Sequence, residues 1–248
     1  MERNETFPIE ELHEIIARLA WAQLEIITDD TEQIQILASG DERTVSELKI
    51  AVDDGELIIE QPQYGLTLDI THGHWMEILV RVPKTWDRIT RLNTISGPIK
   101  ARGLGGENIA IETITGDLKA TQLTAGSIAL RTTAGAVKGT QLICETFAGR
   151  SVSGNIALDN VSAKNYRFTT VSGNIRIDTR GEFEQMELRT VSGDSEVSTE
   201  LGTLNVLARS VSGHKTIHGV TLTDDKSAPM VRLTGVSGDL KISLRQEA

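Results

Sequence analysis

The sequence predicts an all-β fold: a parallel β-solenoid with about 19 residues per coil, preceded by irregular β-strands and a short N-terminal α-helix. A phrase of a β-branched residue, a small residue and glycine recurs eight times, and successive glycines are 19, 19, 19, 19, 20, 20 and 25 residues apart. Apolar residues alternate with period two on both sides of each phrase, which is the spacing of strands. So short a period indicates stacked units. The repeated glycines are Gly97, Gly116, Gly135, Gly154, Gly173, Gly193, Gly213 and Gly238.

The first 23 residues are predicted to form an amphipathic helix that caps the stack. Pro8 suits the first turn of a helix running from Phe7 to Gln23, and acidic residues follow it at the positive end of the helix dipole. The apolar residues repeat at helical spacing. They are Ile9, Leu12, Ile15, Ile16 and Leu19.

Residues 24–92 are predicted to form an N-terminal β region. Short apolar runs such as Ile34–Leu37 and Ile78–Pro83 are separated by turn signals such as Asp53-Asp54-Gly55. Hairpins and irregular first coils both fit this pattern.

Residues 93–246 are predicted to form the solenoid repeats. Ile156 and Leu158 follow one phrase, and Tyr166 and Phe168 precede the next, so each unit holds two short strands joined by two corners. Glycine at a corner adopts positive φ without a steric penalty, and Asn or Asp usually follows it, as turns favour. The small residue before each glycine predicts a row of hydroxyl groups. An insertion at 223–229 lengthens the last interval and is expected to form a surface loop.

The charge is divided unevenly along the chain. The net charge is −10, of which residues 1–92 carry −11 and residues 93–246 carry +2. The acidic first part argues against nucleic acid or an anionic membrane as its partner. Stacking would align basic residues on neighbouring coils, where they repel unless they reach solvent, carboxylates or an anionic partner. The predicted rows are Arg131 with Arg150, Arg189 with Arg209, and Lys100 with Lys119 and Lys138.

Candidate catalytic and metal-binding residues are few. Asp159 and Asp178 would occupy the same outward position on adjacent coils, at a separation near that of the carboxyl pair in retaining glycosidases. His72 and His74 would share a strand face, but a third zinc ligand is not evident, and His214 and His218 are too far apart along a strand for one ion. We therefore expect neither a catalytic site nor a cofactor.

Cysteine usage and hydropathy bear on the compartment. The single cysteine, Cys144, cannot form an internal disulfide. A signal-peptide core near Met1 and an apolar run of about 18 residues are both missing. The expected location is the cytoplasm, with association at the cell surface by an unrecognised route as the alternative.

The repeated phrase also resembles a known family. The segment Ile78–Pro83 followed by phrases such as Thr-Val-Ser-Gly-Asn at 170–174 and Thr-Val-Ser-Gly-Asp at 190–194 is similar to the bacterial putative adhesin domain family, a group of β-helical domains of unknown function. The resemblance covers roughly residues 24–246. It implies the fold and an adhesin-like role, brings no catalytic residues, and permits a link to the cell envelope.

The sequence therefore favours a non-enzymatic binding or scaffolding module whose partner is a protein or an anionic cell-envelope polymer. The main rival is a structural element that polymerises end to end through the last predicted strand, Leu240–Ile242. A carbohydrate-active enzyme using Asp159 and Asp178 is the third hypothesis.

Overall fold

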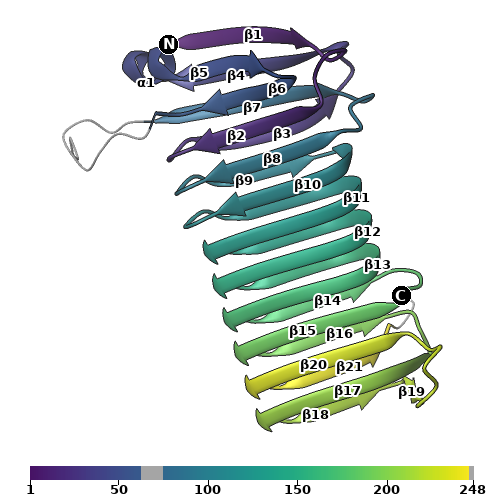
Figure 1. The fold of residues 1–248 in the computed structure, drawn as a ribbon. Helices are drawn as coiled ribbons and strands as arrows, with labels where there is room; N and C mark the ends of the chain where they lie inside the picture. The colour runs from purple at the N-terminus through teal and green to yellow at the C-terminus, as the bar shows by residue number, and fades with distance from the viewer. Residues whose placement is uncertain (63–74, 246–248) are drawn as a thin grey trace.

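The computed structural model describes residues 1–62 and 75–245, and nearly all of them lie in one stack of β-strands (Figure 1). The predicted all-β class is confirmed. The strands wind back and forth between two outer faces, with the apolar residues between them. The strands are β1 (Glu2–Pro8), β2 (Glu14–Leu19), β3 (Gln23–Asp29), β4 (Gln33–Gly40), β5 (Lys49–Asp53), β6 (Glu56–Glu60), β7 (Met76–Pro83), β8 (Ile89–Thr94), β9 (Ile99–Arg102), β10 (Gly105–Thr113), β11 (Leu118–Ala134), β12 (Val137–Ser153), β13 (Ile156–Ser172), β14 (Ile175–Thr179), β15 (Gln185–Ser192), β16 (Ser195–Thr199), β17 (Thr203–Ser212), β18 (Lys215–His218), β19 (Thr221–Leu222), β20 (Met230–Ser237) and β21 (Leu240–Leu244).

Parallel pairing with a constant offset builds the middle of the stack. Leu118 in β11 pairs with Val137 in β12, and Val137 pairs with Ile156 in β13, an offset of 19 residues each time. The inward-facing residues of these strands are fully buried and pack on the equivalent residues of the next coil. Each coil thus buries its apolar side chains on its neighbours, as a solenoid unit must, because it cannot bury them alone.

The two outer faces can be followed strand by strand. The first face runs β1, β4, β7, β3, β9, the first halves of β11 to β13, then β14, β16, β21 and β18. The second face runs β5, β6, β2, β8, β10, the second halves of β11 to β13, then β15, β20 and β17. The strands β11 to β13 bend around one edge and join the faces.

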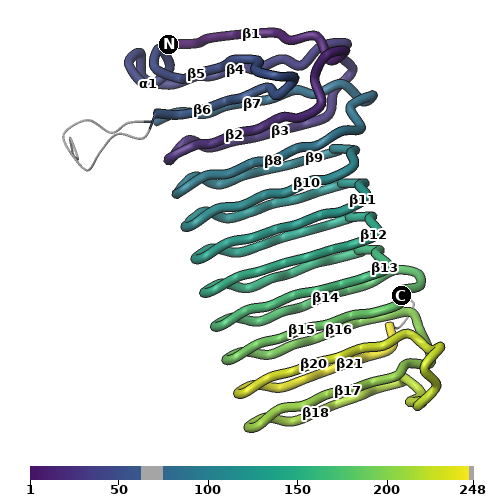
Figure 2. Tube along the Cα trace, viewed as in Figure 1, coloured from purple at the N-terminus to yellow at the C-terminus, as the bar shows by residue number. Residues whose placement is uncertain are grey.

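The chain order and the stacking order differ at the C-terminal end. The coil of β20 and β21 lies between the coil of β15 and β16 and the coil of β17 and β18, although it follows both in sequence. Figure 2 shows this as a yellow coil lying between two green ones. The prediction that Leu240–Ile242 ends the stack is therefore wrong, because this strand is paired on both sides.

The same exchange occurs at the N-terminal end. The coil of β2 and β3 lies between the coil of β6 and β7 and the coil of β8 and β9. The last strands at this end, β1, β4 and β5, pair in antiparallel fashion. A short helix, α1 (Glu42–Glu47), connects β4 to β5.

The predicted N-terminal helix from Phe7 to Gln23 is wrong. This segment forms the end of β1, a turn and β2, and Leu12 donates a backbone hydrogen bond of 3.2 Å to Ile9 within the turn. In β2 the core-facing residues are Ile15, Ala17 and Leu19, which is strand spacing. The apolar residues of the turn and of β2 together have the spacing of a helix, which explains the wrong prediction.

Candidate functional site

The corner glycines are required by close approach between coils more than by positive φ. A Cβ added at any of the eight would lie 1.9 to 2.3 Å from a carbonyl oxygen of the neighbouring corner. Positive φ, which the sequence predicted for all of them, occurs only at Gly135, Gly173, Gly193 and Gly238. Successive corners therefore stack backbone on backbone, and any side chain there would push the coils apart.

The Asn and Asp residues after these glycines tie neighbouring corners together. The side-chain oxygen of Asn155 accepts a hydrogen bond of 2.9 Å from the backbone N–H of Asn174. The side-chain oxygen of Asn174 in turn accepts a hydrogen bond from the backbone N–H of Asp194. The ladder continues from Asp194 to Asp239 and from Asp239 to His214, in the exchanged stacking order. The bond from the His214 N–H lowers the pKa of Asp239, and the His214 side chain adds to this effect.

The predicted lysine row is formed on the first face. Lys119 in β11 pairs directly with Lys100 in β9 and with Lys138 in β12, so the three lysines stand on neighbouring strands about 4.8 Å apart. All three are exposed, and within the described residues none of them makes an ion pair. We call Lys100, Lys119 and Lys138 the lysine column.

The lysine column leads into a shallow hollow of about 350 Å³. Ala157 follows Lys138 in the column, and Arg176 follows Ala157, so a small side chain lies between two cations. Asp159 and Asp178 line the other side of the hollow. The hollow therefore presents positive and negative groups side by side.

The arginine rows on the second face are interrupted by ion pairs and by an inserted strand. Arg131 and Arg150 are direct neighbours, but Arg131 forms an ion pair with Glu112. The predicted contact between Arg189 and Arg209 is wrong, because Thr234 of the inserted β20 lies between them.

Arg189 also has a carboxylate partner, since it contacts Glu187 at 2.6 Å. The arginines are thus partly neutralised or separated, whereas the lysines are direct neighbours that form no ion pair within the described residues, with Glu25 of β3 next in line beside Lys100.

The aspartates proposed as a catalytic pair are adjacent, but Asp178 is occupied. Both of its carboxylate oxygens accept hydrogen bonds from the Arg245 guanidinium, at 2.8 and 2.7 Å. Burial raises the pKa of Asp178, a hydrogen bond with Asp159 raises it further, and Arg245 opposes both effects. Asp178 and Arg245 therefore anchor the chain that leaves β21 onto β14.

A residue that the sequence analysis missed completes the N-terminal corner. The side chain of Gln61 is buried, and its Oε1 accepts hydrogen bonds from the backbone N–H groups of Ala20, Trp21 and Ala22, at 2.9, 3.1 and 3.3 Å. On the next coil the equivalent backbone N–H groups donate to carbonyl oxygens of the neighbouring corner, as the Ser96 N–H does to the Ala20 carbonyl. At the corner of residues 20–22 the Gln61 side chain accepts the hydrogen bonds that a neighbouring corner would otherwise accept. No local sequence pattern indicates this role.

The proposed zinc pair, His72 and His74, lies outside the described residues. Among the residues that the structure describes, no group of three His, Cys, Asp or Glu side chains is placed to hold a metal ion. No helix in the described ranges is long and apolar enough to cross a bilayer.

Comparison with known proteins identifies the family. Residues 13–248 match the Toastrack DUF4097 family, and the chain belongs to it. None of the curated proteins matches the chain.

Several solved structures share the fold at low sequence identity. A putative adhesin from Parabacteroides distasonis is 14% identical with a TM-score of 0.60, covering 97% of each chain. A putative adhesin from Bacteroides fragilis is 15% identical with a TM-score of 0.55, and the match covers 99% of this chain and 97% of that one. A protein from Parabacteroides distasonis named a putative lipid binding protein is 14% identical with a TM-score of 0.57, again covering 99% and 97%.

Proposed function

We propose that this chain is a non-enzymatic binding module that holds an anionic cell-envelope polymer along its first face. The observation that carries the proposal is the lysine column, three neighbouring cations without carboxylate partners among the described residues. Like charges on adjacent strands repel, so an extended anion laid across the strands would relieve that repulsion. The adhesin names of structures with the same fold agree with a binding role.

The spacing of the column favours an elongated ligand over a compact one. Three lysines on strands about 4.8 Å apart extend over roughly 10 Å along the stack. A linear polyanion places a charge near each of them, whereas a single small anion reaches only two. Arg176, which lines the hollow and lies 4.0 Å from Glu196, stands two strands further along the same line.

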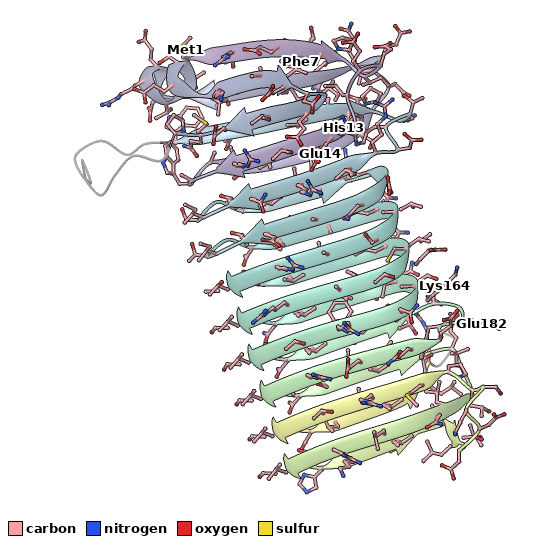
Figure 3. All side chains as sticks on the ribbon, in the orientation of Figure 1. Met1, Phe7, His13, Glu14, Lys164 and Glu182 are labelled. Carbon is pink, nitrogen blue, oxygen red and sulfur yellow. The ribbon has the colours of Figure 1, made fainter. Side chains whose placement is uncertain are left out.

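The test is binding of a polyphosphate of defined length, with neutral dextran as the reference ligand. Replacing Lys100, Lys119 and Lys138 by Gln together should weaken binding about a hundredfold, at about 1 kcal/mol for each lysine near an anionic surface. The matched control is Lys164→Gln, because Lys164 is exposed on the opposite edge and already pairs with Glu145 at 2.7 Å (Figure 3). Equal affinity of the triple variant and the native chain would reject the proposal.

Salt supplies an independent readout of the same proposal. Exposed charges are screened over about 10 Å at 0.1 M salt and about 3 Å at 1 M salt, so the native affinity should fall steeply between these concentrations. The triple variant should show a much shallower dependence.

End-to-end assembly is a second candidate, favoured by the unpaired edges of the terminal strands. Within residues 1–62 and 75–245, β18 pairs only with β21, and most of β17 pairs only with β20. An unpaired edge is a template for another strand. Light scattering should increase with concentration if filaments form, and scattering of constant molecular mass would exclude them.

The carbohydrate-active alternative would require Asp178 to exchange its contact with Arg245 for a substrate. We propose instead that this pair is structural, because the two hydrogen bonds from Arg245 hold the end of β21 in place. Hydrolysis of any member of a broad glycan panel, lost in Asp159→Asn, would overturn this assignment.

A further inference from the structure

One edge of the stack carries a line of exposed apolar side chains. Twelve large apolar residues are exposed in the described part of the chain, and seven of them stand in this line, with exposures from 38% at Val152 to 84% at Val211. The remaining coil contributes Thr133. In stacking order, this apolar column consists of Ile95, Ile114, Thr133, Val152, Val171, Val191, Val236 and Val211.

Strand propensity alone does not account for the apolar column. A β-branched residue favours the extended backbone, but threonine does so as well as valine, and Thr133 occupies the position without disturbing the stack. Seven of the eight positions nevertheless hold valine or isoleucine. Since neighbouring side chains follow each other at about 4.8 Å, they form one apolar strip about 34 Å long. Continuous exposed strips of this kind mark interaction surfaces.

Opposite charges lie on the two sides of this strip. Two residues before the apolar column, on the second face, stand Arg131, Arg150, Arg189 and Arg209. Three residues after it, around the edge, stand Asp117, Asp194 and Asp239, all exposed. The strip therefore has an acidic side and a side lined by arginines, of which Arg131 and Arg189 also contact Glu112 and Glu187 of their own chain.

A second copy of this chain fits such a strip. If two copies lie edge to edge about a two-fold axis parallel to the stack, the cationic side of each faces the acidic side of the other. Arg189 and Asp194 lie on the same coil, and Arg209 lies one coil from Asp239. Arg131 likewise lies one coil from Asp117. Arg131, Arg189 and Arg209 then each face a partner aspartate at their own level or the next, whereas Arg150 faces Asn155.

A lipid surface fits less well. The exposed carboxylates of Asp117, Asp194 and Asp239 would face an anionic bilayer, and the apolar column contains none of the Trp, Phe or Leu residues that interfacial segments use. The size of the strip agrees with a protein interface. A strip about 34 Å long and about 20 Å wide, from two sheets about 10 Å apart and their side chains, offers roughly 700 Å² per copy, close to the roughly 800 Å² of a standard interface.

We propose that the apolar column is the interface of a homodimer whose two copies lie side by side and parallel. This inference is independent of the lysine column, which lies on the first face. In this dimer the two lysine columns would lie on opposite faces, related by the two-fold axis.

Cysteine cross-linking tests the geometry directly. In a parallel two-fold dimer each position of the apolar column faces its own equivalent, so Ile114→Cys, Val171→Cys and Val236→Cys should each form a covalent dimer under mild oxidation. Ile143→Cys is the matched control, because Ile143 is as exposed but lies in β12 at the opposite edge. The native Cys144 should stay silent, since burial raises the pKa of its thiol to about 12.

Each outcome decides the proposal. Cross-linking at all three column positions and not at Ile143 supports it, and Val171→Glu should then raise the dimer dissociation constant about tenfold or more in sedimentation, with Ile143→Glu unchanged. Cross-linking at one position alone would indicate an antiparallel contact and overturn the parallel arrangement. A chain that sediments as a monomer at high concentration overturns the dimer, as does a monomer that floats with anionic phospholipid vesicles. Far-UV circular dichroism confirms that each variant is folded.

Discussion

The two ends of the stack cover the core in different ways. Any stack of strands leaves unpaired edges and an uncovered core at each end, and both invite aggregation. At the N-terminal end, α1 covers the core with Val45, followed by Leu48, and both are buried. At the C-terminal end the last coil, β17 and β18, covers the core by itself.

The composition of the terminal coil explains why it stands last. Lys215 stands in the inward column where the next coil has Leu240, and Ala208 stands where it has Leu233. Leu233 and Leu240 are fully buried, and a lysine there would have to lose its hydration. The more apolar coil therefore lies inside and the more polar coil outside, whatever their order in the chain.

The N-terminal edge uses charges that point inward. On β1, Arg3 forms an ion pair with Glu5 and donates a hydrogen bond to the carbonyl of Leu48. Inward-pointing charges on an edge strand block further pairing. The comparison teaches that at the C-terminal end the stacking order follows the apolar content of the coils, and that both ends carry polar residues at core positions.

The largest expected effect distinguishes the inserted coil from the terminal coil. Ile242 and Ile217 occupy the same column on adjacent coils, but Ile242 is buried and Ile217 only half-buried. Ile242→Ala should lower the free energy of unfolding by about 2–5 kcal/mol, and Ile217→Ala by about half as much or less. Urea unfolding measures both. Equal costs would show that the coil of β20 and β21 is not enclosed.

An intermediate effect is expected from the residue that completes the N-terminal corner. Gln61→Ala leaves three backbone N–H groups without their acceptor, so the free energy of unfolding should fall by about 1–3 kcal/mol. Thermal and urea unfolding provide the measurement. Gln33→Ala, an exposed glutamine on β4, is the control and should cost little. A cost no greater than that of the control would contradict the assigned role.

The smallest effect is a pH dependence at the C-terminal end. The pKa of Asp178 is raised in the folded chain by burial and by Asp159, so the folded state binds this proton more tightly than the unfolded state. Stability from this group is therefore present at low pH and is lost as pH rises through the folded pKa. Asp159→Asn should reduce that loss.

The readout is unfolding in urea from about pH 3 to about pH 7, which spans the ordinary range of carboxyl pKa values. Asp224→Asn, in the exposed loop before β20, is the matched control. An Asp159→Asn variant with the same pH profile as the native chain would remove Asp159 as a cause of the shift.

The sequence predicted the regular middle of this molecule and failed at its ends, for physical reasons. Identical phrases such as those around Gly154 and Gly173 stack on each other, so their spacing fixes both the coil and the corner. Spacing says nothing about which coil stacks on which when a connection passes the level of another coil, as the residues between β16 and β17 do. The 25-residue interval is the available signal, and its length alone predicts only a surface insertion.

The candidate site was predictable to the same extent. The lysine column lies where successive coils are also successive in sequence, and the predicted neighbours are real neighbours. The pair Arg189 and Arg209 crosses the exchanged coils, so its prediction was wrong. The exposure of the apolar column could not be inferred, because valine at a strand position fits a core as well as a surface.

The measurement that tests the exchanged stacking order most directly is an intramolecular disulfide. The hydroxyl oxygens of Ser198 in β16 and Ser243 in β21 lie 3.4 Å apart, and Ser243 separates Ser198 from His218 in β18. The double variant Ser198→Cys, Ser243→Cys should form a disulfide under mild oxidation, and Ser198→Cys, His218→Cys should not. The reverse pattern would show that the coils stack in chain order and would contradict the account.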